Sequence, residues 1–375
     1  MGFITNEWQG TEFFEIHDFH HVEYLVGNAK QAVHFYKTAF GFKPIAYCGP
    51  ETGVRTHVSY VLKNNKNIFI FTTPLSSKSN MSNWLNKHGD GIYDIAFSVA
   101  DAIDAHKSCL SRGAVSVGDN IIYSGDDGVY NKHSIKTYGD TIHSFIEDSN
   151  YSGCWAPNFT NINSEDAFFE TEHNSLVKID HIVGNVEEGK MDEWKEYYEN
   201  IFGFTNFVRF DDSDISTQYS SLRSIVMRSK NWKIKLPINE PASGLKKSQI
   251  EEYLDFNEGP GVQHVAILSN DIIDSISKLR RGGVQFLDTP DTYYENLRDR
   301  VQEVDEDIKV LQDLKILVDR DEEGYLLQLF TKPLEDRPTL FIEIIQRKGS
   351  RGFGQGNFQA LFESIEKEQA LRGNL

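Results

Sequence analysis

Cysteine is scarce in this sequence of 375 residues, whose only thiols are Cys48, Cys109 and Cys154. Three cysteines without the spacing of a metal motif argue against a disulfide framework and against a cysteine-rich zinc site. Such scarcity is typical of proteins from reducing compartments. We therefore expect a cytoplasmic protein.

Long apolar runs and excess positive charge are missing as well. No stretch approaches the ~18 apolar residues that a membrane helix needs, and no basic and then apolar leader is recognisable, so no membrane partner is expected. The chain has 38 Lys and Arg against 56 Asp and Glu, a formal net charge of -18. An acidic surface repels nucleic-acid phosphates, so no nucleic-acid partner is expected.

The predicted elements occur twice in the same order, and the length suits two domains. In the first half, strands are expected over residues 19–28, 56–62, 68–72, 91–99 and 141–147, and helices over 32–40 and 102–112. In the second half, strands are expected over 179–186, 218–227, 233–237, 261–269 and 340–346, and helices over 194–202 and 272–281. The helices are expected to end at Gly41, Gly113, Gly203 and Gly282.

Three short stretches align the two halves. Phe40-Gly41-Phe42 matches Phe202-Gly203-Phe204, residues 89–94 match 259–264, and Phe145-Ile146-Glu147 matches Phe341-Ile342-Glu343. This alignment puts Asp94 at the place of His264 and Glu147 at the place of Glu343. The shorter gap from His21 to Phe40 argues against aligning His21 with His181. We expect a first domain over residues 1–155 that holds no metal, a polar linker over 156–175, and a catalytic domain over 176–375.

A strand–helix–strand–strand–strand unit used twice per half predicts an α+β fold with one open, cupped sheet in each domain. Two segments interrupt the repeat. Residues 291–321 are highly charged and predict a surface helix and loop. Residues 357–372 carry an apolar stripe that predicts an amphipathic lid helix with Asn357 as its N-cap, after a hinge at Gly352, Gly354 and Gly356.

Three polar side chains lie in apolar, strand-like stretches of the second half: His181, His264 and Glu343. A single histidine in such a strand is more often a core residue, and a single glutamate can belong to a salt bridge. Together, two imidazoles and one carboxylate form the ligand set of a non-haem Fe(II) oxygenase site, which keeps positions open. A closed zinc site would need four protein ligands, usually including cysteine.

These stretches, with residues 236–241, 327–332 and 352–358, resemble the 4-hydroxyphenylpyruvate dioxygenase family over about residues 19–362. The resemblance implies two vicinal-oxygen-chelate-like domains and one Fe(II) per chain, held by His181, His264 and Glu343. It implies O2 as co-substrate and conversion of 4-hydroxyphenylpyruvate to homogentisate and CO2 in tyrosine and phenylalanine catabolism. It also implies a homodimer or tetramer, formed through the first domain.

The resemblance further implies a substrate pocket, which comprises Ser224, Pro237, Asn239, Gln249, Gln263, Gln328, Phe330, Phe341, Phe353 and Phe358. No counterparts of these residues are expected in the first half. Three other interpretations stay open: Gln249 can simply begin a helix after a capping box, Gln263 can face the outside of the sheet, and the aromatics can be core. Two other functions also stay open, namely 4-hydroxymandelate synthase and a metal-free binding protein.

Overall fold

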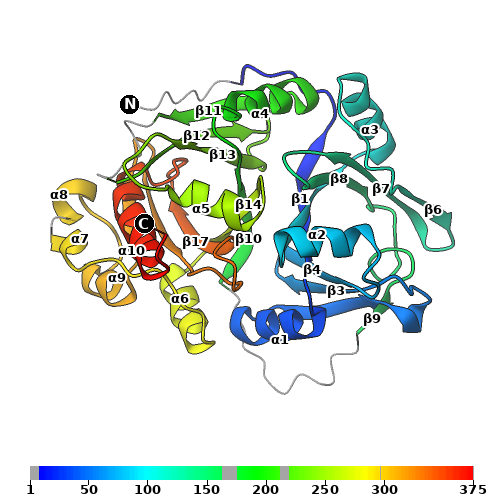
Figure 1. The fold of residues 1–375 in the computed structure, drawn as a ribbon, viewed down its shortest axis with the longest axis horizontal. Helices are drawn as coiled ribbons and strands as arrows, with labels where there is room; N and C mark the ends of the chain where they lie inside the picture. The colour runs from blue at the N-terminus through cyan, green and yellow to red at the C-terminus, as the bar shows by residue number, and fades with distance from the viewer. Residues whose placement is uncertain (1–7, 163–174, 212–218, 296, 375) are drawn as a thin grey trace.

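In a computed structural model of the chain, residues 8–162, 175–211, 219–295 and 297–374 are described (Figure 1). Two curved sheets lie side by side, the first built from the amino-terminal half and the second from the carboxy-terminal half. The architecture is α+β, as predicted. Within the described residues no helix has the length and apolar character needed to cross a membrane.

The first sheet has nine strands in the order β6-β7-β8-β5-β1-β4-β3-β2-β9. They are β1 (Ile16–Leu25), β2 (Lys43–Cys48), β3 (His57–Asn64), β4 (Asn67–Pro74), β5 (Gly91–Val99), β6 (Ile121–Gly125), β7 (Gly128–Lys136), β8 (Ile142–Glu147) and β9 (Thr160–Asn161). The helices of this half are α1 (Ala29–Phe40), α2 (Asn80–His88) and α3 (Ala102–Ser111). Strand β9 lies in the predicted linker and extends the edge of the sheet beyond β2.

The second sheet has eight strands in the order β11-β12-β13-β10-β14-β17-β16-β15. They are β10 (Leu176–Asn185), β11 (Thr205–Phe210), β12 (Ser221–Arg228), β13 (Lys235–Ala242), β14 (Gly261–Ser269), β15 (Leu317–Arg320), β16 (Tyr325–Phe330) and β17 (Phe341–Lys348). The helices are α4 (Met191–Tyr197), continued by a π-turn, α5 (Gln249–Phe256), α6 (Ile272–Arg281), α7 (Thr292–Glu295), α8 (Leu297–Val301), α9 (Ile308–Leu314) and α10 (Phe358–Leu371). The segment predicted as a surface helix and loop thus forms α7, α8, α9 and the edge strand β15.

The two halves repeat one strand–helix–strand–strand–strand unit, as the sequence predicts. The central pairs β1–β5 and β10–β14 are antiparallel and have register shifts at equivalent places. His21 lies opposite Ala96, and His181 lies opposite Ala266. His21 is therefore the counterpart of His181, and the expectation that it would not align is wrong, because the two residues missing from the gap lie outside this strand pair.

The third anchor of the sequence alignment is also wrong. Ala266 pairs with Glu343, whereas its counterpart Ala96 pairs with Ser144. By the same register Glu147 corresponds to Gln346. Both side chains accept a hydrogen bond from the first residue of a helix: Glu147 from the Ala102 amide and Gln346 from the Ile272 amide. Glu147 therefore caps α3, three residues away from the position that corresponds to Glu343.

Two predicted helix ends need correction. Gly41, Gly113 and Gly203 have the left-handed backbone expected of them, but after α6 it is Gly283 that is left-handed, with φ 92°, while Gly282 is helical. Asn357 does not cap α10. Its backbone is already helical in a short 3-10 turn, and its Oδ1 accepts a hydrogen bond from the Tyr293 hydroxyl at 2.6 Å.

The halves contact each other through equivalent parts. The Asn65 side chain, between β3 and β4, donates to the Leu176 carbonyl oxygen at the start of β10. Between β12 and β13, Asn231 donates to the carbonyl oxygen of Ile16, which is the counterpart of Leu176. One hydrophobic core extends through both halves. The first half therefore supports the strands of the second half directly.

Candidate metal centre and pocket

Three side chains of the second sheet meet at one buried point, namely His181 from β10, His264 from β14 and Glu343 from β17. The Nε2 atoms of His181 and His264 lie 3.1 and 3.3 Å from the same carboxylate oxygen of Glu343. Strand register explains the meeting, because β14 pairs with both neighbours and brings Ala266 next to His181 and Glu343. These are the residues that the sequence predicts as metal ligands.

The spacing of the three donor atoms fits one metal ion. Bonds of about 2.1 Å that meet at right angles separate neighbouring donor atoms by about 3.0 Å. The two nitrogen–oxygen distances are close to this value, and all three ligand atoms lie within 4.8 Å of one another. Two imidazoles and one carboxylate on one side of an ion leave the opposite side open. The group could therefore hold a metal that also binds small molecules.

The electrostatics of the group favour a carboxylate beside neutral or partly charged rings. Burial alone would raise the pKa of Glu343, but the adjacent His181 and His264 lower it to about 2. Burial lowers the pKa of His264, and Glu343 opposes that shift. A buried carboxylate without a hydrogen-bonding cation is costly, so this site is suited to a positively charged occupant.

Each histidine is held at its second ring nitrogen. His181 Nδ1 donates to Asp180 Oδ2 at 2.8 Å, and His264 Nδ1 donates to Gln263 Oε1 at 3.0 Å. With Nδ1 protonated, Nε2 keeps its lone pair for a metal. Gln263 therefore turns toward His264 and does not face the outside of the sheet.

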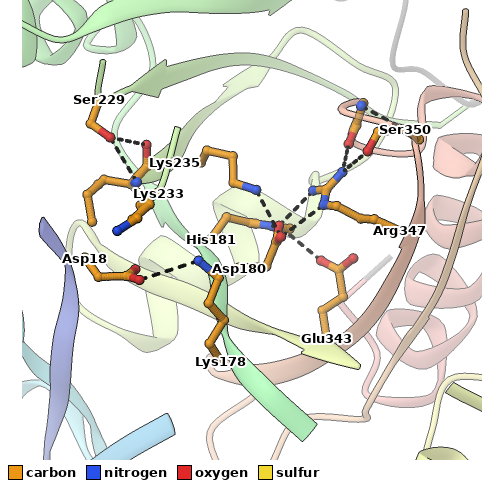
Figure 2. A network of polar contacts seen from close by, with 12 residues as sticks. Asp18, Lys178, Asp180, His181, Ser229, Lys233, Lys235, Glu343, Arg347 and Ser350 are labelled. Carbon is orange, nitrogen blue, oxygen red and sulfur yellow. Dashed lines mark hydrogen bonds and ion pairs between the residues drawn. The ribbon is translucent and has the colours of Figure 1, made fainter. Parts of the chain in front are cut away.

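Asp180 also binds two cations, as Figure 2 shows. Burial alone would raise the pKa of Asp180, but Arg347 and Lys235 hold it well below its usual range. The carboxylate therefore stays charged and can only accept hydrogen bonds. Its attachment to His181 is fixed by charge as well as by geometry.

An apolar pocket with an empty volume of about 600 Å³ opens above the three ligand atoms. Every residue predicted for the metal centre or the substrate pocket lines it, namely His181, Ser224, Pro237, Asn239, Gln249, Gln263, His264, Gln328, Phe330, Phe341, Glu343, Phe353 and Phe358. The structure therefore brings the predicted residues together, while their individual roles stay predictions.

Two aromatic walls flank the histidines. The Phe341 ring stacks on His264, with ring centroids 4.7 Å apart and an interplanar angle of 20°. The Phe353 ring meets His181 edge-on at 5.0 Å. Farther from the metal group, Ser224 and Asn239 pair across β12 and β13, and Gln249 begins α5 after the Ser248 cap. Gln249 therefore both starts a helix and lines the pocket.

Gln328 projects from β16 into this pocket. Among the described residues its Oε1 has no hydrogen-bond partner although it is buried. A buried acceptor of this kind is expected to bind a ligand or water. The backbone of Gly354 lies against the same amide, since a Cβ at Gly354 would be 2.2 Å from Gln328 Oε1. Gly354 therefore permits a close approach, in addition to the hinge role that the sequence suggests.

The sequence reasoning missed several residues of the site. The further lining residues are Val183, Phe210, Leu222, Val226, Leu361 and Phe362. The apolar stripe of α10 contained a signal for Leu361 and Phe362, while the others look like ordinary strand residues. Asp180 and Arg347 were also missed. The signal for Asp180 was a charged residue beside a histidine in an otherwise apolar strand.

The first half holds a second polar cluster at the equivalent place. His21, Glu23 and Asp94 have ligand atoms within 4.8 Å of one another. The Lys132 ammonium lies among them, 2.9 Å from Asp94 and 3.7 Å from Glu23. By strand register Lys132 is the counterpart of Gln328. A lysine cation therefore neutralises the carboxylates here.

The prediction that the pocket residues have no counterparts in the first half is wrong as far as strand positions are concerned, because residues of the first half occupy the corresponding positions. Ser59 pairs with Thr72 as Ser224 pairs with Asn239, and the Ser59 and Thr72 hydroxyls are 2.7 Å apart. Ser59 is the same residue type as Ser224, whereas Thr72 stands at the position of Asn239 and Lys132 at that of Gln328. This half thus retains the backbone of the site with different side-chain chemistry.

Comparisons with known proteins agree with this architecture. Profiles of the Glyoxalase/Bleomycin resistance protein/Dioxygenase superfamily match residues 20–130 and 178–329, one match in each half. The chain is 46% identical to the 4-hydroxyphenylpyruvate dioxygenase of Danio rerio over 100% of this chain and 96% of the relative. The enzyme of that name from Dictyostelium discoideum is 45% identical over 95% of this chain and 99% of the relative.

Solved structures show the same fold. A mutant of 4-hydroxymandelate synthase from Streptomyces coelicolor superposes with a TM-score of 0.83 and 29% identity over 94% of this chain and 99% of its own. The identity to the dioxygenases is higher, extends over nearly the full length of both chains, and is accompanied by a complete two-histidine, one-carboxylate group under an aromatic pocket. The chain belongs to the 4-hydroxyphenylpyruvate dioxygenase family.

Proposed function

We propose that this protein is an Fe(II)- and O2-dependent dioxygenase that converts 4-hydroxyphenylpyruvate to homogentisate and CO2. The observation that carries the proposal is the convergence of His181 and His264 on Glu343 at the base of an aromatic pocket. Relatives that are 45% to 46% identical over almost the whole chain carry the name of this enzyme.

The His181 and His264 imidazoles and the Glu343 carboxylate would hold the iron. Neutral imidazoles suit Fe(II), and one carboxylate offsets part of its charge. Bound iron would supply open positions for the α-keto acid of the substrate and for O2. Because the substrate brings its own keto acid, no separate 2-oxo acid is required.

The protein's own part is to bind and orient the substrate and to exclude water. Phe341 and Phe353 lie against the metal-holding rings and would contact the aromatic ring of the substrate. Ser224, Asn239 and Gln249 are three of the polar groups that line the pocket and would hydrogen-bond the phenol. Phe358 and Phe362 from α10 cover the pocket, so the reaction would proceed away from bulk water.

A second candidate function is 4-hydroxymandelate synthesis, since a structure of that synthase shares the fold at 29% identity. It would use the same substrate and metal but hydroxylate the benzylic carbon. The higher identity to the dioxygenases, 46% for the Danio rerio protein, favours attack on the ring. Mass spectrometry and NMR of the product distinguish homogentisate from 4-hydroxymandelate.

We further propose one iron per chain, a homodimer or tetramer formed through the first half, and a cytoplasmic location. One iron is expected because Lys132 already neutralises the carboxylates of the first cluster, and Ser144 replaces the third ligand. Metal analysis should give a ratio near one per chain, and near zero after His181→Ala with His264→Ala. Light scattering after size exclusion measures the oligomer.

The experiment that tests the function is anaerobic reconstitution with Fe(II), followed by oxygen uptake with 4-hydroxyphenylpyruvate and product analysis. Glu343→Gln keeps the size of the side chain but removes its charge. Loss of a residue that only hydrogen-bonds to a metal ligand typically lowers metal affinity by about 10–100-fold. Because Glu343 is expected to bind the iron itself, iron affinity should fall by more than this. Glu147→Gln is the matched control, since that glutamate caps α3. Full iron occupancy and normal turnover in Glu343→Gln would contradict the assignment.

A further inference from the structure

Asp180 and Arg347 form a buried ion pair next to the metal-holding His181 (Figure 2). Arg347 Nε lies 3.0 Å from Asp180 Oδ1, and Arg347 Nη2 lies 2.7 Å from Asp180 Oδ2. The contact is bidentate and joins residues 167 positions apart in the sequence. Asp180 is only 4% exposed. A pair of this geometry has one well-defined arrangement and can therefore fix what is attached to it.

On one side the pair holds the metal-binding ring. Asp180 Oδ2 accepts from His181 Nδ1 at 2.8 Å, and the same oxygen accepts from Arg347. His264, in contrast, is held by the neutral amide of Gln263. Of the two histidines, only His181 therefore has a charged partner at Nδ1, namely Asp180. Since Arg347 positions Asp180, it also influences the orientation of the His181 ring.

On the other side the pair holds the wall of the substrate pocket. Arg347 Nη1 donates to the Gly352 carbonyl oxygen at 2.7 Å, and the guanidinium lies 5.6 Å from the centre of the Phe353 ring. Phe353 in turn meets the His181 ring. Asp321 binds the amides of Arg351 and Gly352, so the segment is fixed from two directions. This segment leads directly into α10.

In the first half a histidine and an aspartate occupy the corresponding positions, with the acidic residue at the place of the arginine. His20 corresponds to Asp180 and Asp148 to Arg347 by strand register, and His20 Nε2 lies 3.0 Å from Asp148 Oδ2. There the partner of His21 is a second histidine, with Nδ1 atoms 2.6 Å apart, and no carboxylate of the described residues is hydrogen-bonded to the ring. The carboxylate partner and the arginine occur only in the half that has the complete ligand group.

We propose that Asp180 and Arg347 are a positioning pair, in which Asp180 presents His181 Nε2 to the metal and Arg347 sets Phe353 against the same ring. The Asp180–Arg347 ion pair thereby influences both metal affinity and the position of the substrate. The part of this inference that concerns the substrate rests on the proposed function, because it requires that the pocket binds an aromatic keto acid. The part that concerns the metal does not depend on the substrate.

The test uses the full chain with Co(II) as probe, followed by visible absorption and titration, and steady-state kinetics of the Fe(II)-loaded enzyme. Asp180→Asn removes the charge but keeps the shape. It should lower Co(II) affinity by about 10–100-fold and alter the cobalt spectrum, because the His181 tautomer is no longer fixed. Unchanged affinity and an unchanged spectrum would overturn the proposal.

Arg347→Lys is the second variant and keeps the buried charge, so it should fold even if Asp180→Asn does not. An ammonium can neutralise Asp180 but cannot bind Gly352 at the same time. Co(II) affinity should stay within about threefold, while KM for the keto acid should rise at least about fivefold. An unchanged KM, or a loss of metal affinity equal to that of Asp180→Asn, would contradict the division of roles.

Lys178→Met is the matched control, because Lys178 lies on the same strand as Asp180 but pairs with Asp18, at 3.6 Å. Co(II) affinity and KM for the keto acid should both stay near their wild-type values in this variant. A metal loss as large as in Asp180→Asn would show that net charge alone matters, and would overturn the proposal. If wild-type protein binds Co(II) but does not turn over the keto acid, the proposed function fails, while the metal arm still tests Asp180.

Discussion

At the scale of single residues, Gly354 is a pocket position with little room for a side chain. Its backbone is left-handed, with φ 78°, and Gln328 fills the space where a side chain would project. Gly354→Ala should cost about 1–2 kcal/mol in backbone strain and displace the Gln328 amide. We expect kcat/KM to fall by about tenfold or more, since about 1.4 kcal/mol of lost substrate contact suffices, with metal affinity unchanged.

Gly189→Ala is the control for this substitution. Gly189 has nearly the same backbone, with φ 74°, but no described atom lies within 4 Å of the added carbon. Gly189→Ala should lower the thermal unfolding temperature because of the backbone strain, and should leave kcat/KM unchanged. Equal kinetic losses in both variants would mean that strain, and not the displacement of Gln328, is responsible.

The residues of the site differed in how well the sequence revealed them. His181, His264 and Glu343 could be predicted because a polar group in an apolar strand needs a partner, and three such groups suggest one ion. Arg347 could not be predicted, since a basic residue near the end of a strand looks solvent-exposed. Its pairing with Asp180 depends on which strands are neighbours, and that information is not local.

At the scale of elements, α10 is the most informative. It contributes Phe358, Leu361 and Phe362 to the pocket and is anchored by Arg372, whose guanidinium binds Glu252 at 2.6 Å. Removing residues from Gly356 onward should leave a folded protein that binds iron but turns over poorly. Loss of one aromatic contact, about 1.5–3 kcal/mol, lowers kcat/KM by more than about tenfold.

Leu371→Ala serves as the control for the truncation, because Leu371 belongs to α10 but is 76% exposed. Circular dichroism and an iron titration establish that the truncated chain is folded and loaded. Turnover at the full rate in that chain would mean that α10 is ordinary packing and not a cover.

Strand β7 carries the feature that separates the two halves. Lys132 neutralises the buried Asp94, and removing one member of such a pair leaves an uncompensated charge. Lys132→Met should destabilise the protein by about 3–5 kcal/mol in urea unfolding. Adding Asp94→Asn should recover part of the loss. Lys63→Met, at an exposed position of β3, should have little effect.

The register of strand pairing was the feature of the repeat that could not be predicted from the sequence. Phe145-Ile146-Glu147 and Phe341-Ile342-Glu343 have the same pattern, yet Glu147 lies three positions beyond the counterpart of Glu343. Apolar alternation predicts the central strands of both sheets, but it did not predict β2, β6, β7, β11 or β15. It does not determine which residue pairs with which across the sheet, because pairing depends on turns and bulges elsewhere.

At the scale of the whole molecule, the contact between the halves includes a buried histidine. His143 on β8 donates from Nδ1 to the Ile95 carbonyl oxygen, and its Nε2 accepts from the hydroxyl of Tyr198 in the second half. Burial lowers the pKa of His143 to about 3. The folded state thus keeps this ring neutral at pH values where the unfolded chain protonates it.

The unfolded state binds more protons than the folded state below pH of about 6.5, so stability must fall as pH decreases toward about 3. From pH 7.5 to 5.0, His143 should account for a loss of up to about 2 kcal/mol in the free energy of unfolding. His143→Gln should lose correspondingly less on acidification, whatever its stability at neutral pH. Urea unfolding at both pH values measures this difference, and His34→Gln, at an exposed position, should keep the wild-type slope.

The matching register shifts of β1–β5 and β10–β14 have a consequence for biosynthesis. The first sheet adopts this irregular shape around the ammonium of Lys132, a cation that is part of the chain. The curvature of the first sheet is therefore encoded in the polypeptide, and this sheet needs no added ion to form. We therefore expect the proposed iron to enter a scaffold that has already formed, unlike the zinc of small fingers that fold only around their metal. The amount of active protein in a cell should then depend on iron supply, while the amount of folded protein should not.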